Sequence, residues 1–133
     1  MPIELKFLVW SVALFFVMIL AQSVGAIFSK KASIAELVGA RDNMDGAGLT
    51  PFHGRARRAQ YNMIESMCMF VPLILVAAVT NSFSSLTALG AALFFWGRVA
   101  FAPLYWFGVP WVRTLAWAVS IVGILMILWE LLF

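Results

Sequence analysis

A chain of 133 residues has room for one domain, and 64% of these residues are hydrophobic while only 11% are charged. This composition lies far outside that of soluble globular proteins and predicts an integral membrane protein. The formal charge of +3 comes from basic residues beside the hydrophobic segments, where they usually set topology, and nothing in the sequence suggests a nucleic-acid-binding surface. Because Cys68 is the only cysteine and His53 the only histidine, the sequence offers neither an internal disulfide nor a metal-ligand cluster.

The first hydrophobic segment runs from Phe7 to Phe28 and is broken only by Ser11, Gln22 and Ser23. At 1.5 Å per residue it is long enough to cross a hydrocarbon core of about 30 Å, so we expect a membrane span. A cleaved signal peptide is the competing interpretation. Its apolar core would be only about 7 to 15 residues long and would follow a basic flank.

The residues from about 29 to 54 differ from the first segment because charged residues gather there with glycine and proline. We interpret this stretch as a loop, in which residues 33–38 could form a short interfacial helix and residues 42–46 have the composition of a turn. The aspartates of this turn resemble a calcium loop only superficially, since the glycine and the distant glutamate are not in register for an EF-hand.

Three further hydrophobic segments are expected to span the membrane, at about 58–80, 86–104 and 112–132. The helix of the second span is expected to begin in the basic stretch at Arg55, so that Glu65 lies inside it, and Pro72 is expected to bend it. Short connections at 81–85 and 106–110 make consecutive spans antiparallel. The predicted fold is all-α, a four-helix bundle of transmembrane helices that forms a single membrane domain over residues 1–133.

An even number of spans places both termini on the same side of the membrane. Basic residues gather in or beside the first loop, at Lys30, Lys31, Arg41, Arg55, Arg57 and Arg58. By the positive-inside rule this loop is cytoplasmic and both termini are non-cytoplasmic. Arg98 and Arg113 then also fall at the cytoplasmic end. No internal repeat is visible, which disfavours a transporter built of inverted repeats.

A polar stripe enters the second span, made of Arg55, Arg58, Asn62 and Glu65. Spacings of 3, 4 and 3 residues place these side chains within about a quarter of the helix circumference. A charged residue at the centre of a span costs about 2.5 to 3.5 kcal/mol on insertion, so the stripe should face protein or a water-filled cavity. One interpretation is that Arg58 and Glu65 neutralise neighbours across the bundle.

The later spans bring further cations to the same membrane side. Arg98, Phe101 and Tyr105 repeat the spacing of 3 and then 4 residues, and Arg113 stands one turn before Trp117. Together these residues carry more positive charge than Glu65 alone neutralises. We therefore interpret the cluster as a site for an anionic ligand at the cytoplasmic side.

The run Arg58-Ala59-Gln60-Tyr61-Asn62-Met63-Ile64-Glu65 resembles the Arg-Ala-x-x-Asn-x-x-Glu signature of the MAPEG family, the membrane-associated proteins of eicosanoid and glutathione metabolism. Arg98 with Tyr105, and the run from Gly108 to Trp117, resemble later segments of that family. The resemblance covers nearly the whole chain and includes the four-span layout. It indicates a bacterial member located in the inner membrane.

This resemblance implies a homo-trimer in membrane lipids that holds glutathione, as co-substrate, between neighbouring subunits near the cytoplasmic side. Carried over by position, Arg113 matches the arginine that activates the thiol. The glutathione-binding residues would be Arg58, Gln60, Asn62, Glu65, Arg98 and Tyr105. These residue types suit the ligand, because arginines clamp carboxylates bidentately and Glu65 can accept from an ammonium group.

The implied activity is that of a glutathione transferase or peroxidase acting on lipophilic electrophiles. A free thiol with a pKa of about 8.5 is only a few per cent thiolate at neutral pH, so the guanidinium of Arg113 would raise the thiolate fraction. The thiolate would then attack a lipophilic second substrate arriving from the bilayer. The alternative is a non-catalytic membrane protein of the same fold that binds a thiol or lipid anion for regulation or assembly. A channel or transporter is disfavoured because the positive cluster lies at one side only.

The sequence also departs from the eicosanoid-forming members of that family. Phe101 stands where those members tend to carry tyrosine, and Ser66 follows Glu65 where some carry an aromatic residue. The run from Gly39 to Asp42 looks more like bacterial members. A basic residue of the first loop could reach a glutathione carboxylate, and the sequence does not choose among Lys30, Lys31 and Arg41.

Three further side chains are candidates of lower rank. We expect Cys68 to be a buried and therefore inert thiol. We expect His53 to be a loop residue beside the helix cap or on the surface. Tyr105 is open between ligand hydrogen bonding and anchoring at the membrane interface.

Overall fold

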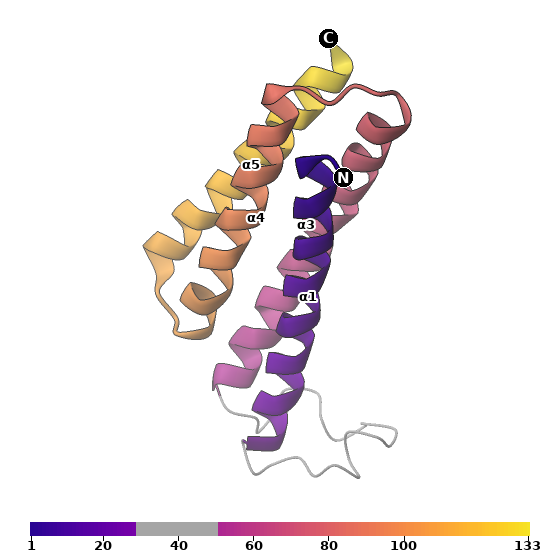
Figure 1. Ribbon diagram of the computed structural model, residues 1–133. Helices are drawn as coiled ribbons and strands as arrows, with labels where there is room; N and C mark the ends of the chain where they lie inside the picture. The colour runs from indigo at the N-terminus through magenta and orange to yellow at the C-terminus, as the bar shows by residue number, and fades with distance from the viewer. Residues whose placement is uncertain (29–50) are drawn as a thin grey trace.

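The computed structural model describes residues 1–28 and 51–133, which form α1 (Ile3–Phe28), α3 (Pro51–Val79), α4 (Ser85–Trp106) and α5 (Pro110–Leu132) (Figure 1). Each of these helices is long and apolar enough to cross a membrane. Successive helices alternate in direction, so both chain ends lie at one end of the bundle and the turn at 107–109 lies at the other (Figure 1). The predicted all-α four-helix membrane fold is confirmed.

The expectations for the first loop concern residues outside the described part of the chain. They include the short helix at 33–38, the turn at 42–46 and the three basic candidates Lys30, Lys31 and Arg41.

The first helix begins at Ile3, four residues before the predicted start of the first span at Phe7. Glu4 in its first turn is buried, and its Oε1 accepts a hydrogen bond of 2.7 Å from Thr87 Oγ1 of α4. Thr87 also belongs to the capping box that begins α4, in which Ser84 Oγ accepts from two backbone N–H groups and Thr87 Oγ1 accepts from Ser84 N. One hydroxyl therefore ties the start of α1 to the start of α4.

The helix α3 begins at Pro51, four residues before the predicted start at Arg55, and continues through Pro72 to Val79. Proline suits the first position of a helix because that position has no use for an N–H group. The early start corrects the prediction for His53, which lies in the first turn of α3 and is only 3% exposed. Its Nε2 lies 3.3 Å from Gln22 Nε2 of α1. Gly25 permits this close approach, since a Cβ there would lie 3.1 Å from the Phe52 ring.

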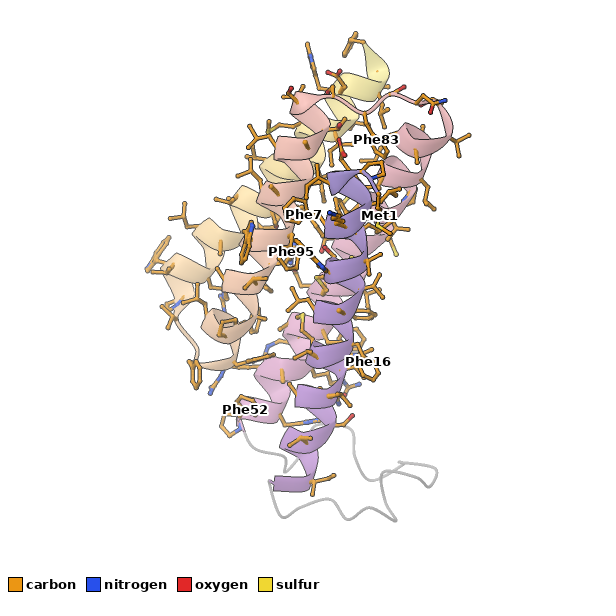
Figure 2. All side chains as sticks on the ribbon, viewed as in Figure 1. Met1, Phe7, Phe16, Phe52, Phe83 and Phe95 are labelled. Atoms are coloured by element: carbon orange, nitrogen blue, oxygen red, sulfur yellow. The ribbon has the colours of Figure 1, made fainter. Side chains whose placement is uncertain are left out.

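The most extensive helix contact joins α4 to α5. A Cβ on Gly90 would lie 2.7 Å from the carbonyl oxygen of Gly123, so the two backbones approach as only small residues allow. The Phe70 ring of α3 stacks on Phe94 of α4, with centroids 3.9 Å apart. α1 packs across α3 and α4, where Phe7 meets Phe95 at 5.6 Å, while Phe16 points away from the bundle (Figure 2). These contacts fix α3 against the α4–α5 pair, which is where the polar residues meet.

Candidate functional site

A pocket of about 190 Å³ opens between α3, α4 and α5, near the end of the bundle that carries the turn at 107–109. Five of its six lining side chains carry hydrogen-bonding groups, counting the indole N–H of Trp117, and Phe101 is apolar. The lining residues are Asn62, Phe101, Tyr105, Arg113, Thr114 and Trp117. Three of the predicted site residues, Asn62, Tyr105 and Arg113, are thus brought together.

The turn between α4 and α5 places Tyr105 against Arg113. The guanidinium carbon of Arg113 lies 4.5 Å from the centroid of the Tyr105 ring, which is a cation–π contact. The Tyr105 ring also contacts Phe101, whose ring meets it edge-on with the two ring centroids 5.3 Å apart. Tyr105 therefore forms part of the pocket wall.

Arg98 lies behind the pocket and does not line it. Its side chain is fully buried at 0% exposure, and its Nη1 donates a hydrogen bond of 2.5 Å to Asn62 Oδ1. The guanidinium also lies over the rings of Phe94 and Phe101, at 5.8 and 5.0 Å. Its Nε and Nη2 have no hydrogen-bond partner among the described residues. The hydrogen bond of Arg98 within the described part of the chain is thus made to Asn62, and its contact with a ligand stays a prediction.

The bond from Arg98 determines what Asn62 offers to the pocket. An asparagine amide has one carbonyl oxygen, which accepts, and one NH₂ group, which donates. Since Arg98 occupies the oxygen, the NH₂ group is left for the pocket. Arg113 and the hydroxyl group of Tyr105 add further donors, whereas the Thr114 hydroxyl already donates to the Pro110 carbonyl and offers the pocket only an acceptor. A pocket of donors with one cation in its wall suits an anionic ligand.

The polar stripe of α3 is divided by the packing. Arg55 turns to α4, where its Nε donates to the carbonyl oxygen of Trp106 at 2.8 Å. Arg58 and Glu65 are exposed, one turn before and one turn after Asn62. Neither pairs with another charged side chain in the described part of the chain, so the interpretation that they neutralise neighbours across the bundle finds no support there.

Gln60 lies seven residues after His53, shares the face of α3 that His53 turns to α1, and is not among the residues that line this pocket. Its contact with a ligand stays a prediction. One further position differs from expectation. Cys68 is exposed, which corrects its prediction as a buried thiol. It lies one turn beyond Glu65, on the face of α3 that turns away from the other helices. Among residues 1–28 and 51–133, no three His, Cys, Asp or Glu side chains are placed to hold a metal ion.

Sequence reasoning missed Thr114 as a pocket residue. It follows Arg113 directly and anchors its hydroxyl on the first turn of α5, where Thr114 Oγ1 donates to the Pro110 carbonyl at 3.0 Å. A signal was present, since a hydroxyl residue beside the candidate catalytic arginine shares its turn of helix. Thr114 was overlooked because it lies far along the sequence from the polar stripe of α3.

An apolar groove of about 300 Å³ lies on another face of the same helix pair. Its lining includes Gly97 and Ala116, which are buried where α4 and α5 approach closely. The lining residues are Trp96, Gly97, Ala100, Leu104, Val112, Leu115, Ala116 and Val119. α4 and α5 thus contribute to a polar pocket on one side and an apolar groove on another.

Comparison with known proteins gives one finding. The model of the MAPEG family matches residues 7–133, a range that includes every residue lining the polar pocket. Neither the comparison with curated proteins nor that with solved structures finds a match.

Proposed function

The chain belongs to the MAPEG family, and on this premise we propose that it is a glutathione-dependent membrane transferase or peroxidase acting on lipophilic electrophiles. Family membership supports a glutathione-related membrane role in general. The observation that carries the specific proposal is the convergence of Arg113, Tyr105 and the NH₂ group of Asn62 in one pocket. Its donors match the carboxylates and the thiolate of a tripeptide thiol.

The pocket would hold only part of such a ligand. Its volume of about 190 Å³ is below the roughly 300 to 1,000 Å³ of pockets that enclose drug-sized molecules. Arg58 and Glu65 flank Asn62 on the exposed face of α3, where one could take a carboxylate and the other an ammonium group. In a homo-trimer, which is general among family members, a neighbouring subunit would cover this open side. We assign Arg98 a supporting role through Asn62 and leave Gln60 out of the site.

Arg113 is the residue proposed to act on the reacting atom. A guanidinium beside the sulfur favours the thiolate, and each pKa unit by which the thiol is lowered corresponds to about 1.36 kcal/mol. The contact with Tyr105 holds this guanidinium in the pocket wall. In the transferase reaction the thiol proton leaves to water, the sulfur lone pair forms the bond to an electrophilic carbon, and the leaving group departs with the electron pair of the bond that breaks. In the peroxidase reaction the thiolate attacks a hydroperoxide oxygen, the O–O bond breaks and the alkoxide takes a proton from water. A second glutathione then converts the sulfenic acid to the disulfide and water. The apolar groove between α4 and α5 provides a surface for a lipophilic second substrate.

The orientation in the membrane follows from charge. The turn at 107–109 and the start of α3, which carries several arginines, lie at the same end of the bundle (Figure 1). The pocket residues Tyr105 and Arg113 flank that turn. Since basic residues stay on the cytoplasmic side, this end is proposed to be cytoplasmic and both termini non-cytoplasmic, in a bacterial inner membrane.

Titration of detergent-purified protein with glutathione tests the proposal. We expect saturable binding accompanied by ultraviolet thiolate absorbance, and we expect Arg113→Ala to lose most of that absorbance while Arg57→Ala, a matched loss of charge outside the pocket, keeps it. Saturable binding without a thiolate signal in the wild-type protein would favour the non-catalytic alternative. Absence of both would count against any glutathione-dependent role.

A further inference from the structure

One carbonyl group at the carboxyl end of α4 accepts its hydrogen bond from a side chain of another helix. The last four carbonyl groups of a helix have no partner within it. Backbone N–H groups of the following turn satisfy three of the four in α4, in the pairs Phe107 to Pro103, Gly108 to Tyr105 and Val109 to Leu104, at 3.0 to 3.1 Å. The fourth carbonyl, that of Trp106, accepts from Arg55 Nε of α3 at 2.8 Å.

Charge favours this arrangement as well. The carboxyl end of a helix carries a partial negative charge that a cation stabilises, and the last turn of α4 contains no basic residue of its own. Arg55, which lies 51 residues earlier in the chain, supplies that cation together with a charge-assisted hydrogen bond. The neighbouring Phe52 adds a ring contact to Trp106 at 6.4 Å.

The arginine side chain also lies along the turn itself. Gly108 has φ of 72°, a conformation that a side chain disfavours. A Cβ at Gly108 would lie 3.6 Å from both Cδ and Nε of Arg55. Three residues, 107–109, connect α4 to α5, and the pocket residues Tyr105 and Arg113 stand on either side of them. Whatever holds this turn therefore holds the contact between Tyr105 and Arg113.

We propose that Arg55 is a positioning residue, which locks the α4–α5 turn and thereby places Tyr105 and Arg113 in the pocket wall. It does not line the pocket and acts only through the turn. Its effect on glutathione rests on the proposed function, whereas its effect on the turn does not.

Hydrogen–deuterium exchange of the ligand-free protein tests the structural part. Arg55→Ala should raise the exchange rate of the amides at 107–109 by about tenfold, the size expected for loss of one charge-assisted hydrogen bond. Arg55→Lys keeps the charge but lacks Nε, so it should restore part of the protection. Arg57→Ala is the matched control, because Arg57 contacts only Tyr61 on its own helix among the described residues and should leave the turn unchanged. Unchanged exchange in Arg55→Ala, or an equal rise in every helix, would overturn the proposal.

Glutathione affinity tests the functional part. Arg55→Ala should weaken binding by about tenfold, with partial rescue in Arg55→Lys, and should add little to the loss caused by Arg113→Ala, because both changes act on one contact. Strictly additive losses would show that Arg55 does not act through Arg113. If the wild-type protein binds no glutathione, the proposed function fails, and the exchange measurement alone decides whether Arg55 holds the turn.

Discussion

Replacing Asn62 by leucine would remove the acceptor of the buried Arg98 guanidinium while keeping the side chain at about the same volume. Arg98 is 0% exposed, and its Nε and Nη2 already lack a partner among the described residues. A hydrogen bond to a charged group contributes about 1.5 to 3 kcal/mol, and a buried charged donor that loses it bears the desolvation cost. We therefore expect Asn62→Leu to lower the free energy of unfolding by about 2 to 3 kcal/mol.

The measurement is reversible unfolding in detergent micelles, followed by tryptophan fluorescence. A second protein, Asn62→Leu with Arg98→Met, supplies the comparison, because replacing both partners by apolar groups is nearly neutral. The double variant should recover most of the stability that the single variant loses. The reasoning is refuted if the single variant loses less than about 0.5 kcal/mol, or if the double variant loses the sum of two independent penalties.

A third substitution separates stability from ligand binding at the same position. Asn62→Asp keeps the acceptor for Arg98 Nη1 and adds a negative charge, so the fold should be at least as stable. The pocket loses the NH₂ donor and gains an anion, so glutathione binding should fall by tenfold or more. Unchanged binding would show that the Asn62 amide does not face the ligand.

Two further changes test the packing of the bundle by the same unfolding measurement. Gly90→Ala should cost about 1 to 3 kcal/mol, because the new Cβ would meet the Gly123 carbonyl at 2.7 Å; Gly54→Ala, whose nearest neighbour is the flexible end of Arg58 at 3.4 Å, is the control and should not destabilise. Glu4→Leu should lower the free energy of unfolding by about 1 kcal/mol, because it removes an acceptor of Thr87 Oγ1. The control Lys6→Leu, at an exposed position, should leave it unchanged. Equal stability of the two variants would mean that the bond between Glu4 and Thr87 does not stabilise the fold.

The number and order of the helices were predictable from sequence because apolar runs of spanning length leave few alternatives. Their starts were not, because the start depends on contacts made elsewhere in the chain. Glu4 extends α1 by bonding to Thr87, which is 83 residues away. His53 stands among proline and glycine, a local composition typical of loops, and its burial arises from the approach of α1 at Gly25.

The candidate site was predictable only in part, because the sequence gives the arrangement of side chains on one helix but not the arrangement of the helices against each other. Helical spacing fixes the angle between side chains on one helix, so it predicts that the four residues of the stripe lie on one side of α3. It does not fix the rotation of that helix against its neighbours. That rotation turns Arg55 and Asn62 to α4 and leaves Arg58 and Glu65 exposed. The role of Arg98 could not be read from sequence either, since it follows from a contact across 36 residues.

The glycine contact between α4 and α5 limits how the pocket can change its width. Because the α4 and α5 backbones are in close contact at Gly90 and Gly123, we expect these two helices to move together and the walls formed by Tyr105 and Arg113 to keep their spacing. Widening of the pocket is then expected on the side of α3, at the bond between Asn62 and Arg98. A ligand too large for the resting pocket would gain room by displacing α3.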